Sequence, residues 1–456
     1  MRKKLLISAA ALIVSIPTFA GDYLTNTNQH AAFLRMVARG ASIDVDGVYS
    51  NPAGLAFLER DGFHLSLTGQ SAYQTRGIHA NYTTFKGVSN GKPELMNANE
   101  YYEGTASAPF IPSFQGLYKK GDWTISAGFA ITGGGGKASF DNGLPMFNSL
   151  VKAGIFQQSV AAGQPIGAEM VTINSALDGT QYIYGAQLGI SYKINDWLSA
   201  YVGGRMNYVK SSYEGYLKAN LIKELGGAEL MTMDLDCQQS GWGVTPILGI
   251  DAKLGKLNLA AKYEFKTNLN IENKTNTLNV PAGIPDEVIK PYADGEQTPS
   301  DIPSFLSVAA QYEILPTLRA SVEYHFFDDK HAGMLNNRQK TLKHGTHEYL
   351  AGVEWDVIKR LTISGGFQKT NYGLSDDFQT DTSFYCDSYS IGFGARVHFT
   401  QSLNMDIAYF WTNYSDYTKS TDDYNGTKVP GTDTYSRTNK VFGLTQLQHF
   451  LPKTSL

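Results

Sequence analysis

The stretch YCDSYSIGFGARVHF, residues 385–399, decides the fold, because its side chains alternate in character from one position to the next. Its even positions are small or polar, and its odd positions, apart from Asp387, are apolar or aromatic. A period of two is that of a β-strand, whose successive side chains point to opposite faces. Residues 181–192 and 318–326 largely repeat the alternation. The pattern therefore predicts an all-β protein whose sheet has one apolar and one polar face.

Strands of this kind recur along the whole chain of 456 residues. We predict about fourteen of them, near residues 62–78, 111–119, 122–133, 180–194, 197–216, 239–254, 256–272, 302–314, 317–328, 346–357, 360–371, 384–399, 402–417 and 437–450. Tight turns, such as 315–316, alternate with long polar loops, such as 134–180. Short turns on one rim and long loops on the other are typical of an antiparallel transmembrane β-barrel.

A secreted β-sandwich is the soluble alternative, and it would bury its apolar faces as a core. The tryptophans favour the barrel, because all five fall near predicted strand ends on the apolar side of the alternation, at Trp123, Trp197, Trp242, Trp355 and Trp411. An aromatic girdle at a membrane interface would place them there. Closure of the barrel would also leave no strand edge unpaired in lipid.

The first twenty residues have the features of a secretory signal peptide. Arg2, Lys3 and Lys4 precede an apolar run from Leu5 to Ile16, which is too short to cross a bilayer as a helix. We therefore expect the chain to be exported to the outer membrane of a Gram-negative bacterium. The net charge of -4 makes nucleic acid an unsuitable partner. Cys237 and Cys386 either pair with each other or remain two separate thiols.

The segment from residue 21 to 61 does not alternate and is too polar to face lipid. It lies in the periplasm, packs inside the barrel, or stays disordered. Residues 28–40 can form a short helix capped by Thr27 or Asn28, with Phe33, Met36, Val37 and Gly40 on one side. The small residues and the Asn-Pro turn that follow suit a chain folded compactly in a confined lumen.

This segment resembles the N-terminal hatch of the FadL/OmpP1/TodX family of outer-membrane transporters of hydrophobic compounds. The likeness lies in the run 38–42, in Asp44, Asp46, Val48 and Tyr49, and in the motif Asn51, Pro52, Ala53, Gly54 and Leu55. The resemblance implies a barrel of about fourteen strands plugged from within by residues 21–61. It also implies passive transport of hydrophobic compounds, with long-chain fatty acids as the expected substrates.

A second likeness to that family falls on the sequence GFAITGGGGKASF, residues 128–140. In the family, the third strand is kinked inward and leaves a side opening toward the membrane. The candidate residues for such a break are Gly133, Gly134, Gly135 and Gly136, since glycine tolerates positive φ and weakens a strand ladder. The alternative is the start of a flexible loop. A phosphate-binding loop is excluded, because Ile131 and Ala138 stand where its glycine and hydroxyl residue would be needed.

Two further groups of residues are candidates for contact with a substrate. Among the charges on the luminal side, Arg205 is our candidate for holding a substrate carboxylate; the alternative is a hydrated lumen whose charges pair with one another. Apolar residues at helical spacing in loops 144–160 and 217–233 suggest a surface site that captures hydrophobic ligands. The candidates there are Phe147, Leu150, Val151 and Phe156, and the alternative is a lid packed against itself.

No serine, histidine and acid set stands out by its spacing, so we expect neither an enzyme nor a cofactor. The loop residues His331, His344 and His347 beside Asp328 and Asp329 are typical of solvated loop charge, with cation binding as the alternative. We divide the chain into a signal peptide (1–20), a hatch (21–61), a barrel (62–450) and a tail (451–456). The expected partners are a hydrophobic small molecule and outer-membrane lipids, with a monomeric barrel. A general porin or a surface adhesin on a barrel scaffold is the competing interpretation.

Overall fold

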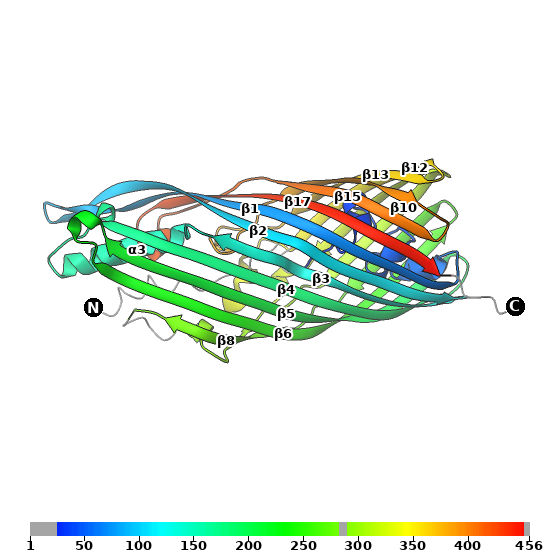
Figure 1. Cartoon of the computed structure of the whole chain (residues 1–456), viewed down its shortest axis with the longest axis horizontal. Coiled ribbons are helices and arrows are strands. Elements are labelled where there is room, and N and C mark those ends of the chain that lie inside the picture. The colour runs from blue at the N-terminus through cyan, green and yellow to red at the C-terminus, as the bar shows by residue number, and fades with distance from the viewer. Residues whose placement is uncertain (1–24, 282–289, 451–456) are drawn as a thin grey trace.

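The computed structural model describes residues 25–281 and 290–450, which form one closed barrel of fourteen antiparallel strands (Figure 1). Each wall strand pairs with the next one along the chain, and β17 pairs back with β1 to close the barrel. The wall strands are β1 (Gly62–Ser89), β2 (Lys92–Lys120), β3 (Trp123–Phe140), β4 (Val171–Lys193), β5 (Leu198–Leu221), β6 (Glu229–Leu254), β7 (Leu257–Glu264), β10 (Phe305–Leu315), β11 (Leu318–Phe327), β12 (Thr346–Ile358), β13 (Leu361–Asn371), β14 (Ser388–His398), β15 (Leu403–Tyr414) and β17 (Gly431–Phe450).

The number and order of the wall strands confirm the prediction, but several strands run further than the alternation indicated. β1 and β2 form a hairpin that continues through most of the predicted loop 79–110, and β17 still pairs with β1 at Tyr82. Pairing persists there because a backbone ladder needs only a partner strand, not an apolar face. Three short strands, β8 (Asn270–Asn279), β9 (Gln297–Pro299) and β16 (Tyr417–Thr421), also lie in predicted loops.

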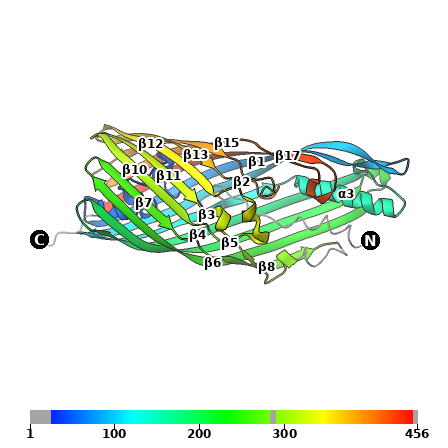
Figure 2. The same cartoon turned by 180° about the vertical axis from the view of Figure 1, so that it is seen from behind.

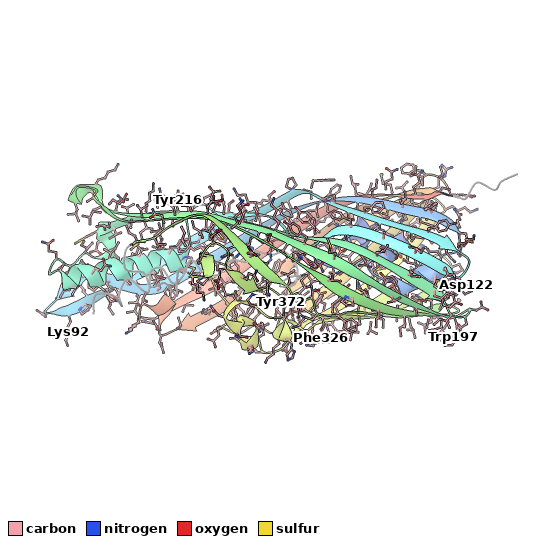
Figure 3. The ribbon with its side chains drawn as sticks, turned by 90° about the horizontal axis from the view of Figure 1, so that it is seen from below. Lys92, Asp122, Trp197, Tyr216, Phe326 and Tyr372 are labelled. Atoms are coloured by element: carbon pink, nitrogen blue, oxygen red, sulfur yellow. The ribbon has the colours of Figure 1, made fainter. Side chains whose placement is uncertain are left out.

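The two ends of the barrel differ in the length of their connections. Figure 3 labels Asp122 and Trp197 at the short-turn end, and Lys92 at the tip of the β1–β2 hairpin beyond the other end. On the long-loop side, β1–β6 extend well past the strands from β10 to β15, as Figure 2 shows from behind. The barrel therefore rises higher on one side than on the other.

The outer surface of the barrel is apolar, and the inner surface is polar. On β14, for example, Phe393 is 54% exposed on the outside, whereas Ser390 and Arg396 are buried inside. Trp123, Trp197 and Trp242 are about half exposed or more, at 56%, 49% and 67%. An apolar surface of this extent is suited to contact with hydrocarbon rather than water.

The strand predicted from residue 384 begins later, at Ser388, and this part of the prediction is wrong. Tyr385, predicted on the outward face, is buried beneath the long-loop end, and so is Cys386. The Asp387 carboxylate accepts hydrogen bonds from Tyr372 N and Asn371 Nδ2, so the chain turns before the ladder can begin. Cys386 and Cys237 are separate free thiols. The last strand, β17, keeps a regular register with β1 up to Phe450.

Helices are few and short. They are α2 (Ala31–Arg35), α3 (Pro145–Ala161) and the 3-10 helices η1 (Val45–Val48), η2 (Ala53–Phe57), η3 (Ala168–Met170), η4 (Lys223–Leu225), η5 (Lys290–Tyr292), η6 (Asp329–His331), η7 (Leu335–Thr341) and η8 (Tyr424–Gly426). Within the described ranges, no helix combines the length and the apolar character needed to cross a membrane. The residues assigned to a signal peptide, 1–20, lie outside the described part, as do the tail residues 451–456.

The hatch occupies the barrel lumen toward the short-turn end (Figure 1). Its helix α2 is shorter than predicted and is capped by His30, whose ring accepts a hydrogen bond from Ala32 N. Beyond α2 the chain becomes extended at Met36, because the apolar side chains that follow pack against the barrel wall. This apolar contact includes Phe33, Leu34, Met36 and Val37 of the hatch and Leu350, Ala408, Phe410 and Val441 of the wall.

The long-loop end is closed by a cap built around α3. The four residues predicted as an exposed capture surface are buried there: Phe147, Leu150, Val151 and Phe156 are 6%, 1%, 0% and 2% exposed. Phe156 stacks on Phe85 of β1 with ring centroids 4.6 Å apart, and Phe147 and Val151 join a cluster with β4, β5 and β6. The expectation of exposed apolar surface is therefore wrong, and the alternative of a packed lid describes these residues.

Candidate functional site

The Asn51 motif joins the hatch to three neighbouring wall strands. The Asn51 amide donates hydrogen bonds to Asp251 Oδ2 of β6 at 2.6 Å and to Ser42 O at 3.3 Å, and its oxygen accepts one from Gly54 N at 3.1 Å. The next two carbonyls accept hydrogen bonds from the wall, Pro52 O from Ser191 of β4 and Ala53 O from Ser199 of β5. Asn51 thus forms hydrogen bonds both with backbone groups of the hatch and with a buried carboxylate of the wall.

Gly54 completes this turn, since an added Cβ would overlap the Asn51 amide. The motif therefore needs a residue without a side chain at that position. The predicted motif residues lie together in one buried joint between hatch and wall.

Ion pairs hold the other side of the hatch. Arg35 lies 2.5 Å from Glu354 of β12 and 3.1 Å from Asp406 of β15, and Asp44 lies 2.5 Å from Arg396 of β14. Burial alone would raise the pKa of Asp44, but Arg396 and Arg39 outweigh it and hold this pKa well below its usual range. The carboxylate is therefore charged at any physiological pH, and its pairing does not weaken until strongly acidic conditions.

Arg205, predicted to receive a substrate carboxylate, already binds a carboxylate of the barrel wall. Its guanidinium forms a bidentate pair with Glu264 at 2.7 and 2.9 Å, and it also donates to Gln187. The ring of Tyr49 in the hatch lies 5.1 Å from the same guanidinium. A substrate would have to displace Glu264, so Arg205 is better described as part of the contact between hatch and wall, and it takes no part in the function proposed below.

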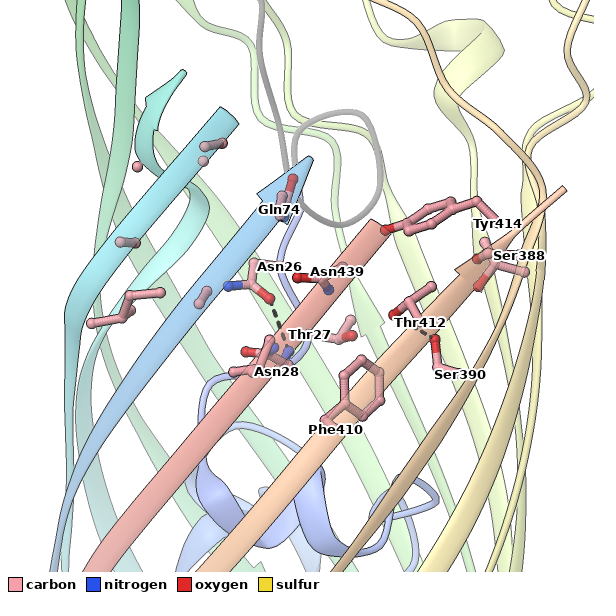
Figure 4. Close-up of a pocket in the computed structure, with 18 of the residues that line it drawn as sticks. Asn26, Thr27, Asn28, Gln74, Ser388, Ser390, Phe410, Thr412, Tyr414 and Asn439 are labelled. Atoms are coloured by element: carbon pink, nitrogen blue, oxygen red, sulfur yellow. Dashed lines mark hydrogen bonds between the residues drawn. The ribbon is translucent and has the colours of Figure 1, made fainter. Parts of the chain in front are cut away.

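A chamber of about 90 Å³ lies in the lumen above the hatch (Figure 4). Its floor includes Phe33 of α2 and Phe410 of β15, whose ring centroids are 6.2 Å apart. Ser390 and Thr412 form part of a hydroxyl-bearing wall, and they are joined to each other by a 2.9 Å hydrogen bond.

The wall of the barrel is interrupted beside this chamber, between β2 and β3. These strands pair up to Phe114 and Phe129, and pairing resumes only at Ser107 and Lys137. Between these points, residues 108–113 of β2 and 130–136 of β3 have no partner on the opposite strand. We call this interruption the lateral gap. It contains the four candidate glycines, which lie inside β3 and not at its end as predicted.

Two features give the lateral gap its shape. β3 stays paired with β4 through two register shifts, around Thr132 and Gly135, so it bends without leaving the sheet. The hatch reaches the same place from inside, because Asn26 N donates to Thr132 O at 2.7 Å. On the outer surface, Phe110 of β2 and Phe129 of β3 flank the gap and are 70% and 39% exposed. The gap thus has an apolar outer margin, and several of its residues, among them Ala108 and Gly134, line the chamber.

The aromatic side chains of the outer surface indicate where the lateral gap lies along the barrel axis, measured from the short-turn end. Tyr184 of β4 pairs with Ile131 at the gap, and its ring stacks near that of Tyr208 on β5. The lower girdle includes Tyr192, which lies on β4 at the short-turn end beside Trp123. The strand between Tyr184 and Tyr192 spans about 26 Å, or roughly 20 Å of barrel height at the usual tilt. The gap therefore lies near the upper border of the apolar band.

Replacing Gly134 by alanine should lower the melting temperature more than replacing Gly255 by alanine. Both glycines have positive φ, at 67° and 64°, so either change brings about 1–2 kcal/mol of backbone strain. Only at Gly134 would the new Cβ also overlap a neighbour, the carbonyl oxygen of Gln181, whereas Gly255 has open space. Thermal unfolding of the two variants provides the comparison, and equal shifts would contradict a tight contact between β3 and β4 at the gap.

The remaining predicted candidates form no site. Among the described residues, no group of three or more His, Cys, Asp and Glu side chains is arranged to hold a metal ion. His331 pairs with Asp328 at 2.6 Å on the surface, while Asp329 is buried and accepts a hydrogen bond from Thr346 N.

Known structures with the same architecture were found by structural comparison, although no family model and no curated protein matches the chain. A FadL homologue from Pseudomonas aeruginosa is 13% identical and superposes with a TM-score of 0.61, covering 96% of this chain and 100% of that one. The toluene transporter TbuX from Ralstonia pickettii is 15% identical, with a TM-score of 0.55 and coverages of 92% and 98%.

The toluene transporter TodX from P. putida is 14% identical, with a TM-score of 0.54 and coverages of 90% and 95%. At such identities the likeness establishes the fold and no more. The class of protein that the fold defines is a fourteen-stranded barrel of the FadL type, with a hatch inside its lumen.

Proposed function

We propose that this protein carries hydrophobic small molecules across a Gram-negative outer membrane by passive diffusion, with long-chain fatty acids among its substrates. The observation that carries the proposal is the lateral gap, an interruption of strand pairing whose residues line an internal chamber and whose outer margin is apolar. The similar barrels described above include two toluene transporters, which supports an apolar cargo. Transport of this kind needs no catalytic group and no cofactor.

A lateral exit has a clear physical advantage for such a cargo. The hatch lies in the lumen toward the short-turn end and is held there by hydrogen bonds and ion pairs. A molecule leaving along the axis would also enter water, at a cost of about 0.8 kcal/mol for each exposed methylene. A molecule leaving through the gap would pass Phe110 and Phe129 and reach lipid directly. Asn51, Pro52, Ala53 and Gly54 would serve to keep the axis closed.

In this proposal the mature barrel acts as a monomer, and its apolar band contacts outer-membrane lipids. Residues 1–20 serve as the export signal, and residues 21–61 form the hatch. The long-loop end faces the outside of the cell, as in other barrels of this kind. The cap around α3 then lies at the entrance side of the barrel (Figure 1).

Uptake by living cells tests the proposal. A strain that lacks the gene should accumulate labelled fatty acids and monoaromatic hydrocarbons more slowly than the wild type, and a plasmid copy should restore the rate. Uptake of a small sugar, which enters through porins, should not change and serves as the control. Wild-type accumulation of every hydrophobic compound in the deletion strain would refute the proposed function.

A further inference from the structure

Two histidines meet at the seam where the barrel closes. His64 of β1 and His449 of β17 stand at directly paired positions near the short-turn end. Their Nδ1 atoms are 2.6 Å apart, and their ring planes cross at 82°. His64 is 2% exposed, on the luminal side of its strand, whereas His449 is half-buried. Solvent therefore reaches the pair from the side of His449.

A hydrogen bond to the backbone shows which nitrogen of the His64 ring carries a proton. His64 Nε2 lies 2.9 Å from the carbonyl oxygen of Arg60, the second residue before β1. A carbonyl oxygen can only accept, so His64 Nε2 is the donor. In a neutral imidazole the other nitrogen then presents a lone pair. His64 Nδ1 therefore accepts the hydrogen bond from His449, with its ring held in place by the backbone.

This contact is close to the geometry of two imidazole ligands on one metal ion. Imidazole nitrogens bind Zn²⁺ at about 2.0–2.1 Å, so two of them at right angles on one ion lie about 2.9 Å apart. The two Nδ1 atoms would need to separate by only about 0.3 Å. The proton between them would move to the half-exposed Nε2 of His449, which leaves a lone pair on each Nδ1. The bond from His64 to the Arg60 carbonyl is of the type that orients ligating histidines.

The charged groups around the pair indicate which ions it suits. Arg60 donates to the Gln401 carbonyl oxygen at 2.7 Å, Lys119 lies 3.8 Å from the Asp61 carboxylate, and Asp44 is paired with arginines. With both signs of charge nearby, selectivity would rest on the two nitrogen ligands. Imidazole suits zinc, copper and nickel, whereas Ca²⁺ and Mg²⁺ prefer oxygen ligands.

We propose that His64 and His449 together bind one divalent transition-metal ion, such as Cu²⁺ or Zn²⁺, with water at its remaining positions. The ion would tie the first wall strand to the last one, at the seam on which closure of the barrel depends. An ion that binds the folded barrel and not the unfolded chain stabilises the fold. This site is separate from the lateral gap and does not depend on the proposed transport.

A second pair of histidines provides a matched control. The rings of His344 and His347 have centroids 5.1 Å apart, close to the 4.7 Å of the seam pair. Their Nδ1 atoms do not face each other, because that of His344 bonds to the Gly345 carbonyl and that of His347 to the Tyr324 hydroxyl. We therefore expect the H347Q variant to bind metal as the wild type does.

Titration of the purified, untagged mature barrel with Cu²⁺ tests the proposal, and electron paramagnetic resonance identifies the ligands. Cu²⁺ is the probe because it forms the most stable complexes among the common divalent ions. The wild type and H347Q should show a signal split by two imidazole nitrogens, and H64Q and H449Q should each lose it. Each of these two variants should also bind Cu²⁺ at least about tenfold more weakly, since even a hydrogen-bond partner of a ligand contributes that much. Ca²⁺ should not compete.

Thermal unfolding provides a second readout. Cu²⁺ should raise the melting temperature of the wild type and of H347Q, but not that of H64Q or H449Q. Unchanged copper affinity in assembled H64Q and H449Q barrels, or a loss in only one of them, would overturn the proposal. Loss of the two-nitrogen signal in H347Q would overturn it as well. None of these measurements uses a transported substrate, so a negative result would leave the proposed transport untouched.

Discussion

Replacing Gly133 and Gly136 together by valine should reduce uptake of a hydrophobic probe at least about tenfold while the barrel still assembles. Valine favours regular strand pairing by up to about 1 kcal/mol at each position. At Gly136 the new side chain would also approach Ser107 O at 3.2 Å and Ala108 Cβ at 3.5 Å, both at the upper margin of the lateral gap. Gly134 is kept, because its positive φ requires glycine. Probe uptake by a deletion strain that expresses the variant measures the effect.

The control for this double variant is valine at Gly87. This glycine lies in β1 beyond the barrel, and nothing lies within 4 Å of the position an added Cβ would take. The substitution therefore raises the β-strand propensity at position 87 and leaves the lateral gap unchanged, so uptake should stay at the wild-type level. Binding of the probe to the cell surface should persist in both variants. Full uptake through a barrel whose gap is shown structurally to be closed would exclude lateral exit at this place.

Replacing Asn51 by alanine should release the hatch and raise the ion conductance of the barrel. The change removes hydrogen bonds to Asp251, Ser42 and Gly54, and it leaves Asp251 buried with Asn258 as its other amide donor. Leaving a buried polar partner unsatisfied costs about 1–3 kcal/mol, so the joint should open more often. Single-channel recordings of the variant should show openings that the wild type lacks.

Asn207 offers a matched control for the hatch variant. It is an equally buried asparagine, but its side chain bonds to Thr132 and Thr245 of the wall and not to the hatch. N207A should therefore resemble the wild type in its conductance. If N51A assembles normally and differs from the wild type in neither conductance nor uptake, the motif does not hold the hatch.

Much of the fold can be predicted from the sequence because period-two alternation is a local property. The stretch around Phe393 shows it, since neighbouring residues there face outward and into the lumen in turn. The glycine run could also be linked to a break, because glycine weakens a strand wherever it stands. The sequence could not show which neighbouring strand loses its pairing with β3 at this break. Only the register of β2 with β3 shows that residues 108–113 have no partner on β3.

The partners of Arg205 and of the α3 residues could not be predicted for a different reason. The alternation of side chains along its strand places Arg205 in the lumen. Nothing in the neighbouring sequence indicates that Glu264, on another strand, lies 2.7 Å away. Apolar spacing in α3 predicts an apolar helix face, and the partner of that face, including Phe85 of β1, is distant in sequence.

The most direct test of the proposed route is a planar-bilayer recording of the purified wild-type barrel. In the proposed route the hatch blocks the axis and the lateral gap leads to lipid rather than to water, so ions should find no continuous path. We predict no steady conductance, even at high salt. A stable, porin-like open level would show that the lumen is a water-filled pore, and it would contradict a barrel dedicated to apolar molecules that leave through its wall.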